Sequence, residues 1–412
     1  MRPAARLQAI ADLLQAAAHS AQPLDRLVQS WGRRNRYAGS KDRRHISDRL
    51  FAIYRHYGAL TARLGSDTPL LVAMLAAHIL HDEPLEAVLD MADGSRHAPP
   101  PLSKADEASL HHAATHPPQA RADRLNVPHW LLPHIEAQLG DETDAALSAM
   151  GARAPVDVRV NGLKGDREAA RAALAADDIE AAPLPHVDTA LRLVGTPRLP
   201  GTAAFESGLV EVQDAGAQAI SAMCAAQPFD TVMDFCAGAG GKALALADAM
   251  QNKGRVLVHD VNEERMGDLP ARAARAGVQI IEPVSSADLA DFDAGCDIVV
   301  ADVPCSGAGR WRRAPETKWR VTTEQLDGLV ALQADILSQA ARLVRPGGRL
   351  VYMTCSLLAC ENKDQIEKFI ADNQLFSLLT TELPLGQAGV TQWHPARGDS
   401  DGFFCAVLQR SG

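Results

Sequence analysis

The sequence contains no apolar run long enough to cross a membrane. A spanning helix needs about 20 predominantly apolar residues, and the longest candidate, residues 69–80, is shorter and contains His78. The first 14 residues carry Arg2 and Arg6 but no apolar core followed by a cleavage site, and their apolar residues recur at helical spacing. We therefore expect no membrane partner, an amphipathic N-terminal helix, a buried helix over residues 69–80 and a cytoplasmic protein.

Paired and clustered cysteines are also absent. The 412 residues include seven cysteines, an odd number, with no CxxC pair and no cluster of cysteine and histidine. A disulfide framework or a zinc site would require such spacing. We predict neither a disulfide framework nor a metal site, and we expect most of these cysteines to be small buried residues.

The chain lacks an excess of positive charge, since its formal net charge is −10. This balance argues weakly against nucleic acid as a partner. Positive charge is nevertheless concentrated in two clusters, a first basic cluster (Arg33, Arg34, Arg36, Lys41, Arg43, Arg44) and a second basic cluster (Arg310, Arg312, Arg313, Lys318, Arg320, with Trp311 and Trp319 between them). Each is typical either of phosphate contact with base stacking or of a solvated surface with a buried tryptophan.

The length predicts two or three domains. Residues 1–145 are mainly helical by apolar spacing, with a polar connector over 97–118, and residues 146–205 form a small α+β subdomain. In that subdomain we predict an edge-like strand over 156–160, a helix over 166–175 and a strand over 191–194. Residues 206–412 form the third domain.

The third domain alternates short apolar strands with helices. The strands are expected at 231–235, 255–258, 297–301, 349–353 and 402–409, and the helices at 242–250, 262–276 and 323–344. This alternation predicts an α/β fold with a parallel, doubly wound sheet whose ligands bind at the carboxyl ends of the strands.

The first strand of this sheet runs into a glycine-rich loop and then a helix. The loop consists of Cys236, Ala237, Gly238, Ala239, Gly240, Gly241 and Lys242, and the next strand ends at Asp260. Glycines permit a close ligand approach, and a carboxylate at that place can accept hydrogen bonds from a ribose. A plain tight turn, NAD and S-adenosylmethionine all fit this loop, but its spacing is not GxGxxG, which favours S-adenosylmethionine.

Two further strands end next to cysteines. The strand over 297–301 is followed by Asp302 and Cys305, and the strand over 349–353 by Cys355. Carboxyl ends of parallel strands meet at one edge of a sheet, so these side chains are expected to converge beside the cofactor loop. The alternative is that both cysteines are buried packing residues.

Two convergent cysteines suit methylation at carbon 5 of a pyrimidine. That carbon becomes nucleophilic when a thiolate adds reversibly to carbon 6. Asp302 could then hold the ring nitrogen or exocyclic amine of a cytosine, and a base must remove the carbon 5 proton. Hydride transfer from NAD would give the two cysteines no task.

The motifs that carry this chemistry resemble those of a known family. The segments CAGAGGK, DVPCSGAGRWRRAPETKWR and VYMTCSLLACENKDQI, preceded by VQDAGAQ, are similar to the signatures of the RNA 5-methylcytosine methyltransferases. The resemblance covers roughly residues 206–370 and is weaker in the N-terminal third, which resembles an RNA-binding domain like that of the antitermination factor NusB. It implies a Rossmann-like class I S-adenosylmethionine-dependent methyltransferase domain preceded by a helical NusB-like domain.

The resemblance also implies residue roles. Cys355 of the TCS motif would be the nucleophile and Cys305 of the DxPC motif would help to release the product, while Lys242 and Asp302 would line the cytosine pocket. The loop from Cys236 to Lys242, with Asp260 and Asp302, would hold S-adenosylmethionine.

The sequence departs from the family pattern at three places. Ala239 and Val303 replace a usual proline and a common alanine. The acidic cofactor contact that the family usually has after the third strand of its sheet has no clean equivalent. Ser285, Ser286 or Asp288 could fill that last place. Ribosomal RNA of the small subunit is the expected substrate, with transfer RNA or a noncatalytic RNA-binding role as alternatives, and a monomer is expected.

Overall fold

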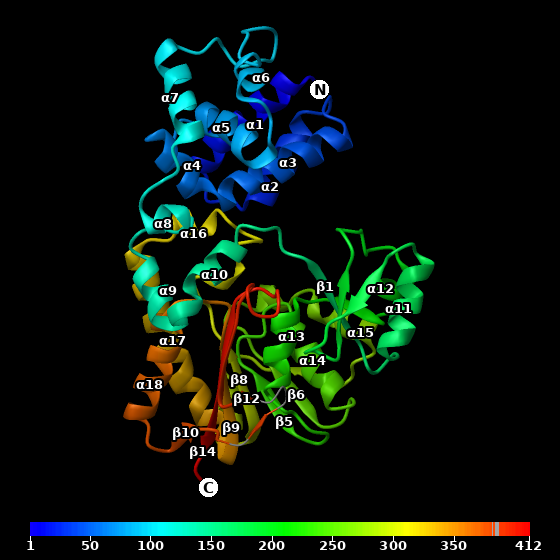
Figure 1. Cartoon of the computed structure of the whole chain (residues 1–412). Helices are drawn as coiled ribbons and strands as arrows, with labels where there is room; N and C mark the ends of the chain where they lie inside the picture. The colour runs from blue at the N-terminus through cyan, green and yellow to red at the C-terminus, as the bar shows by residue number, and fades with distance from the viewer. Residues whose placement is uncertain (381, 384–386) are drawn as a thin grey trace. The chain divides into compact units, whose positions relative to one another are not determined.

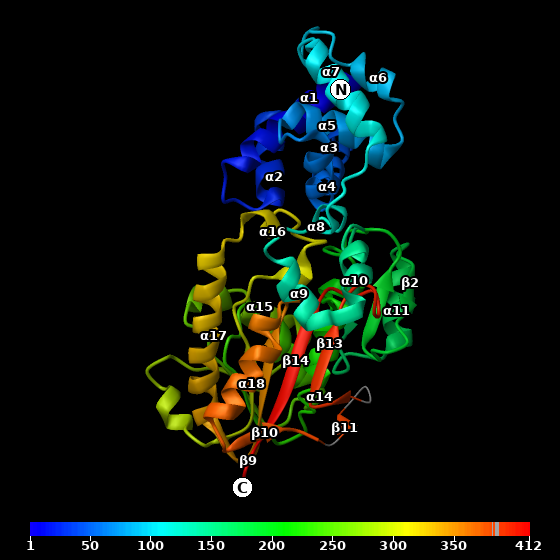
Figure 2. The same ribbon diagram turned by 60° about the vertical axis from the view of Figure 1, so that its left-hand side comes forward.

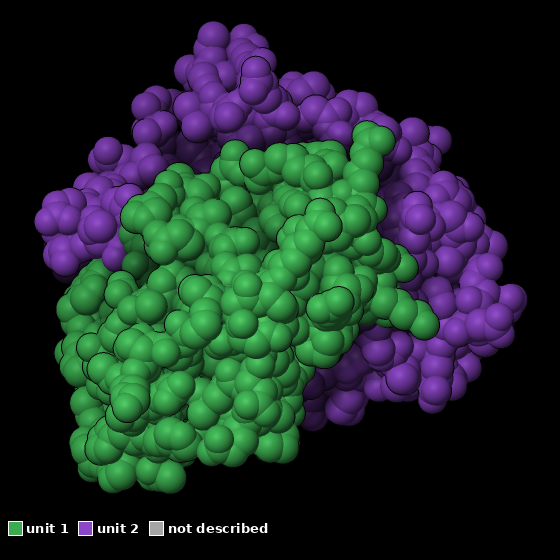
Figure 3. Space-filling model, turned by 90° about the horizontal axis from the view of Figure 1, so that it is seen from above, with its two compact units in different colours: residues 1–136, 140–153, 311–320 green, residues 137–139, 154–310, 321–412 purple. Residues whose placement is uncertain are grey.

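The computed structural model describes residues 1–380, 382–383 and 387–412 (Figure 1). The chain divides into two compact units, coloured separately in Figure 3. The helical unit contains residues 1–136, 140–153 and 311–320, and the α/β unit contains residues 137–139, 154–310 and 321–412. The helical unit is therefore discontinuous in sequence, because it includes ten residues that follow a strand of the α/β unit.

Helices make up the first 150 residues. Their bounds are α1 Pro3–Ala18, α2 Leu24–Arg34, α3 Ser40–Arg55, α4 Tyr57–Leu64, α5 Pro69–His81, α6 Leu85–Leu89, α7 Lys104–Thr115, α8 Arg121–Arg124, α9 Leu132–Leu139, the 3₁₀ turn η1 Gly140–Glu142 and α10 Thr143–Ala149. The amphipathic N-terminal helix is confirmed as α1, whose apolar side chains are buried. The buried helix over 69–80 is confirmed as α5, which contacts α1, α4, α6 and α7 and buries every side chain from Leu71 to Ala77.

Among the described residues, no single helix is long and apolar enough to span a bilayer. Only α4 and α5 taken together reach that length and composition, and they are bent by 110°.

The polar connector expected over 97–118 is wrong in part, because it contains α7. Ser103 caps this helix by accepting a hydrogen bond from the backbone amide of Asp106. Leu110 and Ala113 are fully buried against the helical core. Prolines and histidines flank the helix, so the breaking residues mark its ends and not its absence.

The α/β unit contains a small antiparallel sheet with the strand order β2-β3-β1-β4. The strands are β1 Val156–Val160, β2 Ala181–Pro183, β3 Ala190–Leu193 and β4 Val210–Val212, with helices α11 Arg167–Ala176 and α12 Ala203–Glu206. The helix and strand expected over 166–175 and 191–194 are confirmed. The edge position expected of β1 is wrong, since β1 pairs on both sides. Its polar residues Asp157 and Arg159 are buried because Arg192 and Asp248 neutralise them at 2.8 and 2.9 Å.

The large sheet has the strand order β10-β14-β9-β8-β5-β6-β7, and β13 also pairs with β14. Strands β5 Thr231–Asp234, β6 Arg255–Val258, β7 Ile281–Pro283, β8 Cys296–Asp302 and β9 Val344–Thr354 are parallel. Strands β10 Phe376–Leu378, β13 Val390–Trp393 and β14 Phe403–Arg410 are antiparallel to their neighbours. The sheet is therefore mixed. The prediction of a wholly parallel sheet is wrong at the edge formed by β10, β13 and β14. A two-stranded ribbon, β11 Glu382–Leu383 and β12 Gln387–Ala388, completes the strands.

Helices cover both faces of this sheet (Figures 1 and 2). One face carries α13 Ala215–Ala222, α14 Gly241–Ala249 and α15 Leu269–Ala276, and the other carries α17 Thr323–Leu343 and α18 Lys363–Asp372. Along β5, Val232 and Met233 pack into opposite clusters, so the strand is apolar on both sides. The single helix expected over 262–276 is wrong, since α15 begins at Leu269, with Pro270 in its first turn, after a separate 3₁₀ turn, η2 Glu263–Met266. The other short elements are η3 Leu289–Phe292, η4 Ala308–Arg310, α16 Thr317–Arg320 and η5 Ala359–Glu361.

Candidate active site at the carboxyl ends of the strands

Two cysteines meet just beyond the carboxyl ends of neighbouring strands. Strands β8 and β9 are parallel, with Asp302 opposite Met353 in the register. Cys305 and Cys355 follow these strand ends, and their Sγ atoms lie 3.4 Å apart. All seven cysteines are free thiols. The structure thus places these two thiols in direct contact without a covalent link.

The two thiols differ in their electrostatic surroundings. The hydrogen bond from Cys305 lowers the pKa of Cys355, and the positive charges of Arg310 and Lys242 lower it further, against the opposing effects of burial and Asp302. The bond to Cys355 and burial raise the pKa of Cys305 well above its usual value. The surroundings therefore favour a thiolate at Cys355 with Cys305 as the proton donor to it.

Lys242 and Asp302 form an ion pair beside these thiols. Lys242 stands in the first turn of α14, and its Nζ donates to Oδ2 of Asp302 at the end of β8. Burial works against the charge of Lys242, but Asp302 and Asp234 raise the pKa of the amine above its usual value. The site therefore contains a fixed positive charge, with the partly exposed carboxylate of Asp302 next to it.

A buried carboxylate that the sequence analysis did not single out joins the two cysteine loops. Glu361 in η5 accepts hydrogen bonds from the Ser306 amide at 2.7 Å, the Gln333 side chain at 3.0 Å and the hydroxyls of Ser306 and Ser356. It is fully buried. The only signal in the sequence was its place six residues after Cys355, which without the fold gives no reason to expect contact with Ser306.

The glycine-rich loop between β5 and α14 approaches its surroundings closely. Gly240 has φ +78°, and a Cβ there would lie 2.2 Å from Cδ1 of Leu269, so this position requires glycine. Beneath the loop, burial raises the pKa of Asp234 to about 7. Neither of its buried oxygens has a well-formed hydrogen bond within the described chain. The backbone of the loop thus packs closely against Leu269, and the Asp234 carboxylate beside it is an acceptor that a ligand could use.

Asp260 holds the loop from the end of the next strand. Its carboxylate accepts hydrogen bonds from the amides of Gly238 at 2.9 Å and Asn262 at 3.0 Å, and Arg265 lies 3.1 Å away. Asp260 itself is 2 % exposed. In this structure its oxygens support the loop, so the expected contact with a ribose hydroxyl would share an acceptor already in use.

Three residues after β7, Ser285, Ser286 and Asp288, are candidates for the cofactor contact that the family usually makes with an acidic residue. They bond to each other or to His259, which follows β6. The Ser286 hydroxyl lies 3.0 Å from Nε2 of the buried His259, and Ser285 donates to Asp288 at 2.6 Å. His259 Nδ1 contacts the Phe235 carbonyl at 2.9 Å. Ser286 is therefore linked through His259 to Phe235, just before the glycine-rich loop, whereas Ser285 and Asp288 pair with each other.

The second basic cluster is mostly unavailable to RNA, which corrects its interpretation as a phosphate-binding surface. Trp311, Arg312 and Lys318 are 2 %, 1 % and 3 % exposed. The Lys318 Nζ donates to the Arg55 carbonyl at 3.1 Å, and Arg320 donates to the carbonyls of Ala17 and Gln22. These residues anchor the segment 311–320 within the helical unit. Arg310, just before that segment, is exposed.

No group of three or more His, Cys, Asp or Glu side chains within the described residues is arranged to hold a metal ion.

Comparison with known proteins identifies the family of the chain. Residues 221–409 match the family model described as 16S rRNA methyltransferase RsmB/F, and residues 127–198 match the ferredoxin-like domain of Methyltr_RsmF/B-like proteins. The chain is 32 % identical over 306 residues to a probable ribosomal RNA small subunit methyltransferase B of Synechocystis, covering 70 % of this chain and 68 % of that protein. It is 34 % identical over 299 residues to ribosomal RNA small subunit methyltransferase B of Sodalis glossinidius, with the same coverage.

Solved structures share the fold. The crystal structure of PH0851 superposes with a TM-score of 0.76 at 26 % identity, covering 100 % of this chain and 99 % of that one. The crystal structure of NSun6 from Pyrococcus horikoshii with SFG gives a TM-score of 0.61 at 19 % identity, covering 69 % of this chain and 98 % of that one. The predicted combination of a helical region, a small α+β subdomain and a class I methyltransferase domain is confirmed. The chain spans about two thirds of its curated relatives, and it belongs to the family of 16S rRNA methyltransferases RsmB/F.

Proposed function

We propose that this protein transfers a methyl group from S-adenosylmethionine to carbon 5 of a cytosine in small-subunit ribosomal RNA, with Cys355 as the nucleophile. The observation that carries the proposal is the contact between the two thiols, 3.4 Å apart beside the Lys242–Asp302 ion pair. Family membership supports RNA methylation. The cysteine pair favours the chemistry at carbon 5, because transfer to a nitrogen or a ribose oxygen requires no thiolate.

The reaction begins at Cys355. Its thiolate forms a bond to carbon 6 of the cytosine, and the electrons of the carbon 5–carbon 6 double bond move toward carbon 5 and the ring. Asp302 and Lys242 would hold the polar edge of the base and balance the charge that develops, a role that their ion pair beside the thiols supports. Bound S-adenosylmethionine supplies the electrophilic methyl group.

Product release reverses the addition. Once carbon 5 carries the methyl group, a base removes the carbon 5 proton, the double bond re-forms and the bond between carbon 6 and Cys355 breaks, which returns the electron pair to the thiolate. The contact of Cys305 with Cys355 supports a role for Cys305 in assisting this step. Its raised pKa keeps it protonated while Cys355 attacks.

The residues present fit S-adenosylmethionine. The loop from Cys236 to Lys242 leaves backbone accessible, and the buried Asp234 carboxylate offers acceptors suited to an ammonium group. Asp260 and Asp302 would complete the cofactor site. We further propose that residues 1–145 form a NusB-like RNA-binding domain, that residues 146–205 link it to the catalytic domain of residues 206–412, and that the exposed arginines of the first basic cluster contact phosphates.

Two single variants and bisulfite sequencing of RNA test the function. Cells with and without the gene are compared, and loss of one protected cytosine in 16S rRNA is expected; loss in a transfer RNA would move the substrate to that class. In vitro, Cys355→Ala should abolish methyl transfer. Cys305→Ala should methylate RNA but remain covalently attached, giving a band shift that survives denaturation.

The outcomes separate the alternatives. Exchanged phenotypes of the two variants would assign the nucleophile to Cys305. Full activity in both would refute the thiol mechanism. Binding of RNA without methylation of any RNA by the wild-type protein would support the noncatalytic alternative.

A further inference from the structure

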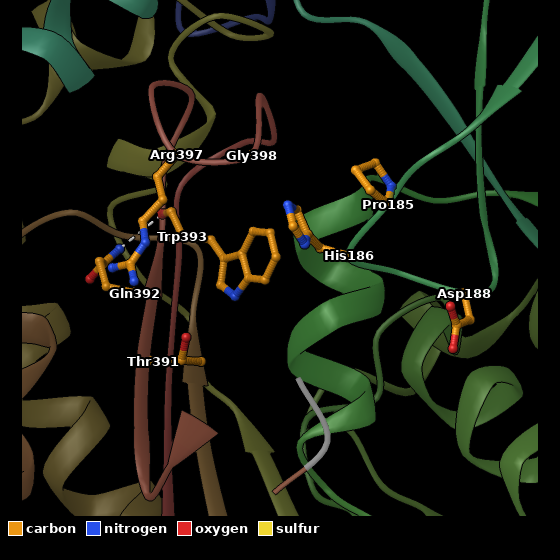
Figure 4. A pocket seen from close by; sticks show the side chains of 8 residues that line it. All are labelled: Pro185, His186, Asp188, Thr391, Gln392, Trp393, Arg397 and Gly398. Atoms are coloured by element: carbon orange, nitrogen blue, oxygen red, sulfur yellow. Dashed lines mark hydrogen bonds between the residues drawn. The ribbon is translucent and has the colours of Figure 1, made fainter. Parts of the chain in front are cut away.

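The α/β unit contains a cavity of about 540 Å³ whose lining includes neither Cys305 nor Cys355 (Figure 4). One wall comes from the loop between β2 and β3, and the other comes from β13 and the turn that follows it. The lining residues are Pro185, His186, Asp188, Thr391, Gln392, Trp393, Arg397 and Gly398. Its volume lies within the roughly 300–1,000 Å³ that is typical of small-molecule sites.

Trp393 is held in a fixed place at this cavity. Part of the indole packs against the buried cluster of Val187, Ala190, Ala215 and Ala219. A Cβ at Gly398, which has φ +89°, would lie 2.8 Å from Cζ3 of the ring. Glycine is therefore needed for the turn to pass over the indole. The rest of the ring is presented toward His186 across the cavity (Figure 4).

Four polar side chains of the cavity have no partner among the described residues, whereas the Gln392 amide is bonded to the Gln138 side chain and to the carbonyls of Trp393 and Phe403. Within residues 1–380, 382–383 and 387–412, no hydrogen bond or ion pair is formed by the Trp393 Nε1, the Arg397 guanidinium, the Asp188 carboxylate or the His186 ring. The neighbouring acid Asp399 is paired with Arg192. The cavity thus combines an aromatic surface with the cation of Arg397, the anion of Asp188 and the His186 ring, none of which has a partner among the described residues.

The sheet register places this cavity near the candidate nucleophile. Trp393 lies opposite Phe403 on β14, and Phe404 lies opposite Thr354 on β9, so Trp393 and Cys355 are at the same level two strands apart. Strands are spaced about 4.8 Å apart, so the separation across the sheet is about 10 Å. Trp393 and Cys355 also pack against the same buried cluster and hence on the same face.

We propose that this cavity binds an unpaired nucleotide of the RNA substrate, close in the strand to the methylated cytosine, with its base stacked on Trp393. This inference rests on the proposed function. A base offers a π-face to the indole and an edge with donors and acceptors to Asp188 and His186, while Arg397 is suited to a phosphate. A purely phosphate-binding surface would have no use for the carboxylate of Asp188, which lies on the wall opposite Trp393 (Figure 4).

Binding of a single-stranded RNA oligonucleotide of about 12 nucleotides to the full-length protein tests the site. Trp393→Ala should lower the affinity by roughly 5- to 100-fold, whereas Trp393→Phe should keep most of it because phenylalanine can also stack. The matched control is Phe229→Ala, which removes an aromatic side chain that is 78 % exposed just before β5. Phe229 lies at the amino end of β5, whereas Cys355 follows the carboxyl end of β9, so the variant should bind as the wild type does.

Salt dependence separates stacking from charge. Arg397→Gln should reduce the slope of log affinity against log salt concentration by about 0.7, the value for one phosphate contact on a single strand. Trp393→Ala should leave the slope unchanged. In methylation assays Trp393→Ala should raise the KM for RNA while kcat at saturating RNA stays near the wild-type value, because the cavity does not contact the reacting atoms.

Equal affinity of Trp393→Ala and Phe229→Ala would overturn the inference and leave the proposed function intact. Loss of affinity in Trp393→Phe as large as in Trp393→Ala would also overturn it, since stacking would then not be the cause. If the wild-type protein binds the oligonucleotide but methylates no RNA, the proposed function fails, and a selective loss of affinity in Trp393→Ala would still support the nucleotide site. Absence of any RNA binding by the wild type would refute both.

Discussion

Glu361 accepts a hydrogen bond from the backbone amide of Ser306 at 2.7 Å, across 55 residues of sequence. The same carboxylate also accepts a hydrogen bond from the Ser356 hydroxyl. One buried side chain therefore links the residue after Cys305 to the residue after Cys355. The 3.4 Å contact between the thiols depends on these two loops keeping their relative positions.

Glu361→Ala should lower both stability and catalysis. The change leaves several buried donors without an acceptor, which costs about 1–3 kcal/mol each, so we expect a loss of about 2–5 kcal/mol in the free energy of unfolding. As a positioning residue, Glu361 should affect kcat more than the KM for S-adenosylmethionine. In the Cys305→Ala background, Glu361→Ala should also reduce the covalent RNA adduct.

Two variants keep that prediction testable. Glu361→Gln retains the size and one acceptor and should fold with intermediate activity. Glu367→Ala, on the exposed side of α18, should behave as the wild type in every assay. Normal adduct formation in Glu361→Gln and Glu361→Ala alike would contradict a positioning role.

Removing the charge of Lys242 should make Cys355 less acidic. Lys242 helps to lower the pKa of the Cys355 thiol, and thiolates are the reactive form. In Lys242→Met, the rate of alkylation of Cys355 by iodoacetamide should rise with pH along a curve moved to higher pH by about one unit. The measurement uses mass spectrometry of the labelled peptide and needs no methyl transfer. An unchanged curve would mean that Arg310 and Cys305 alone set the acidity of Cys355.

The stability of the helical unit should depend on pH through Lys318. Burial lowers the pKa of Lys318 to about 7, whereas an unfolded lysine has a pKa near 10.4. Between these values the unfolded state binds more protons, so the free energy of unfolding rises with pH by up to about 1.4 kcal/mol per unit, and this stabilisation is lost as pH falls toward 7.

Urea denaturation at pH 7, 8 and 9 checks this effect. Lys318→Met lacks the titrating amine, so the stability of the wild type relative to the variant should increase steadily over this range. A constant difference would show that Lys318 remains charged in the folded protein. Arg55 also lowers the pKa of Lys318. Burial lowers the pKa of Arg55 itself to about 10, above this pH range, and Arg55 is present in both proteins.

The first basic cluster should contribute to RNA affinity through charge. Arg33, Arg34 and Arg36 are exposed at the end of α2 and just beyond it. Replacing all three by glutamine should reduce the slope of log affinity against log salt by up to about 2, at roughly 0.7 for each phosphate contact. Arg342→Gln serves as the control, because Arg342 is exposed on α17 and paired with Asp293. An unchanged slope in the triple variant would place RNA elsewhere.

Local sequence patterns determined much of this protein. Apolar spacing was enough to predict α1, α5 and the main strands of the large sheet, because periodic burial follows from the geometry of single elements. The sequence was also enough to predict that Asp302, Cys305 and Cys355 converge, because they follow parallel strands whose carboxyl ends lie at the same side of the sheet. The choice of Cys355 over Cys305 came only from the family resemblance.

Only the tertiary structure decided which side chains are accessible and which distant residues meet. Arg312 and Lys318 have the composition of an RNA-binding surface, yet they are buried because the segment 311–320 packs within the helical unit. Glu361 contacts Ser306 across 55 residues of sequence. The cavity beside Trp393 is likewise lined by two segments that lie far apart in the sequence. No local pattern predicts either pairing. Charge and residue type are properties of the sequence, but burial and long-range contact arise when the chain folds, and these set what each charged or aromatic side chain can do.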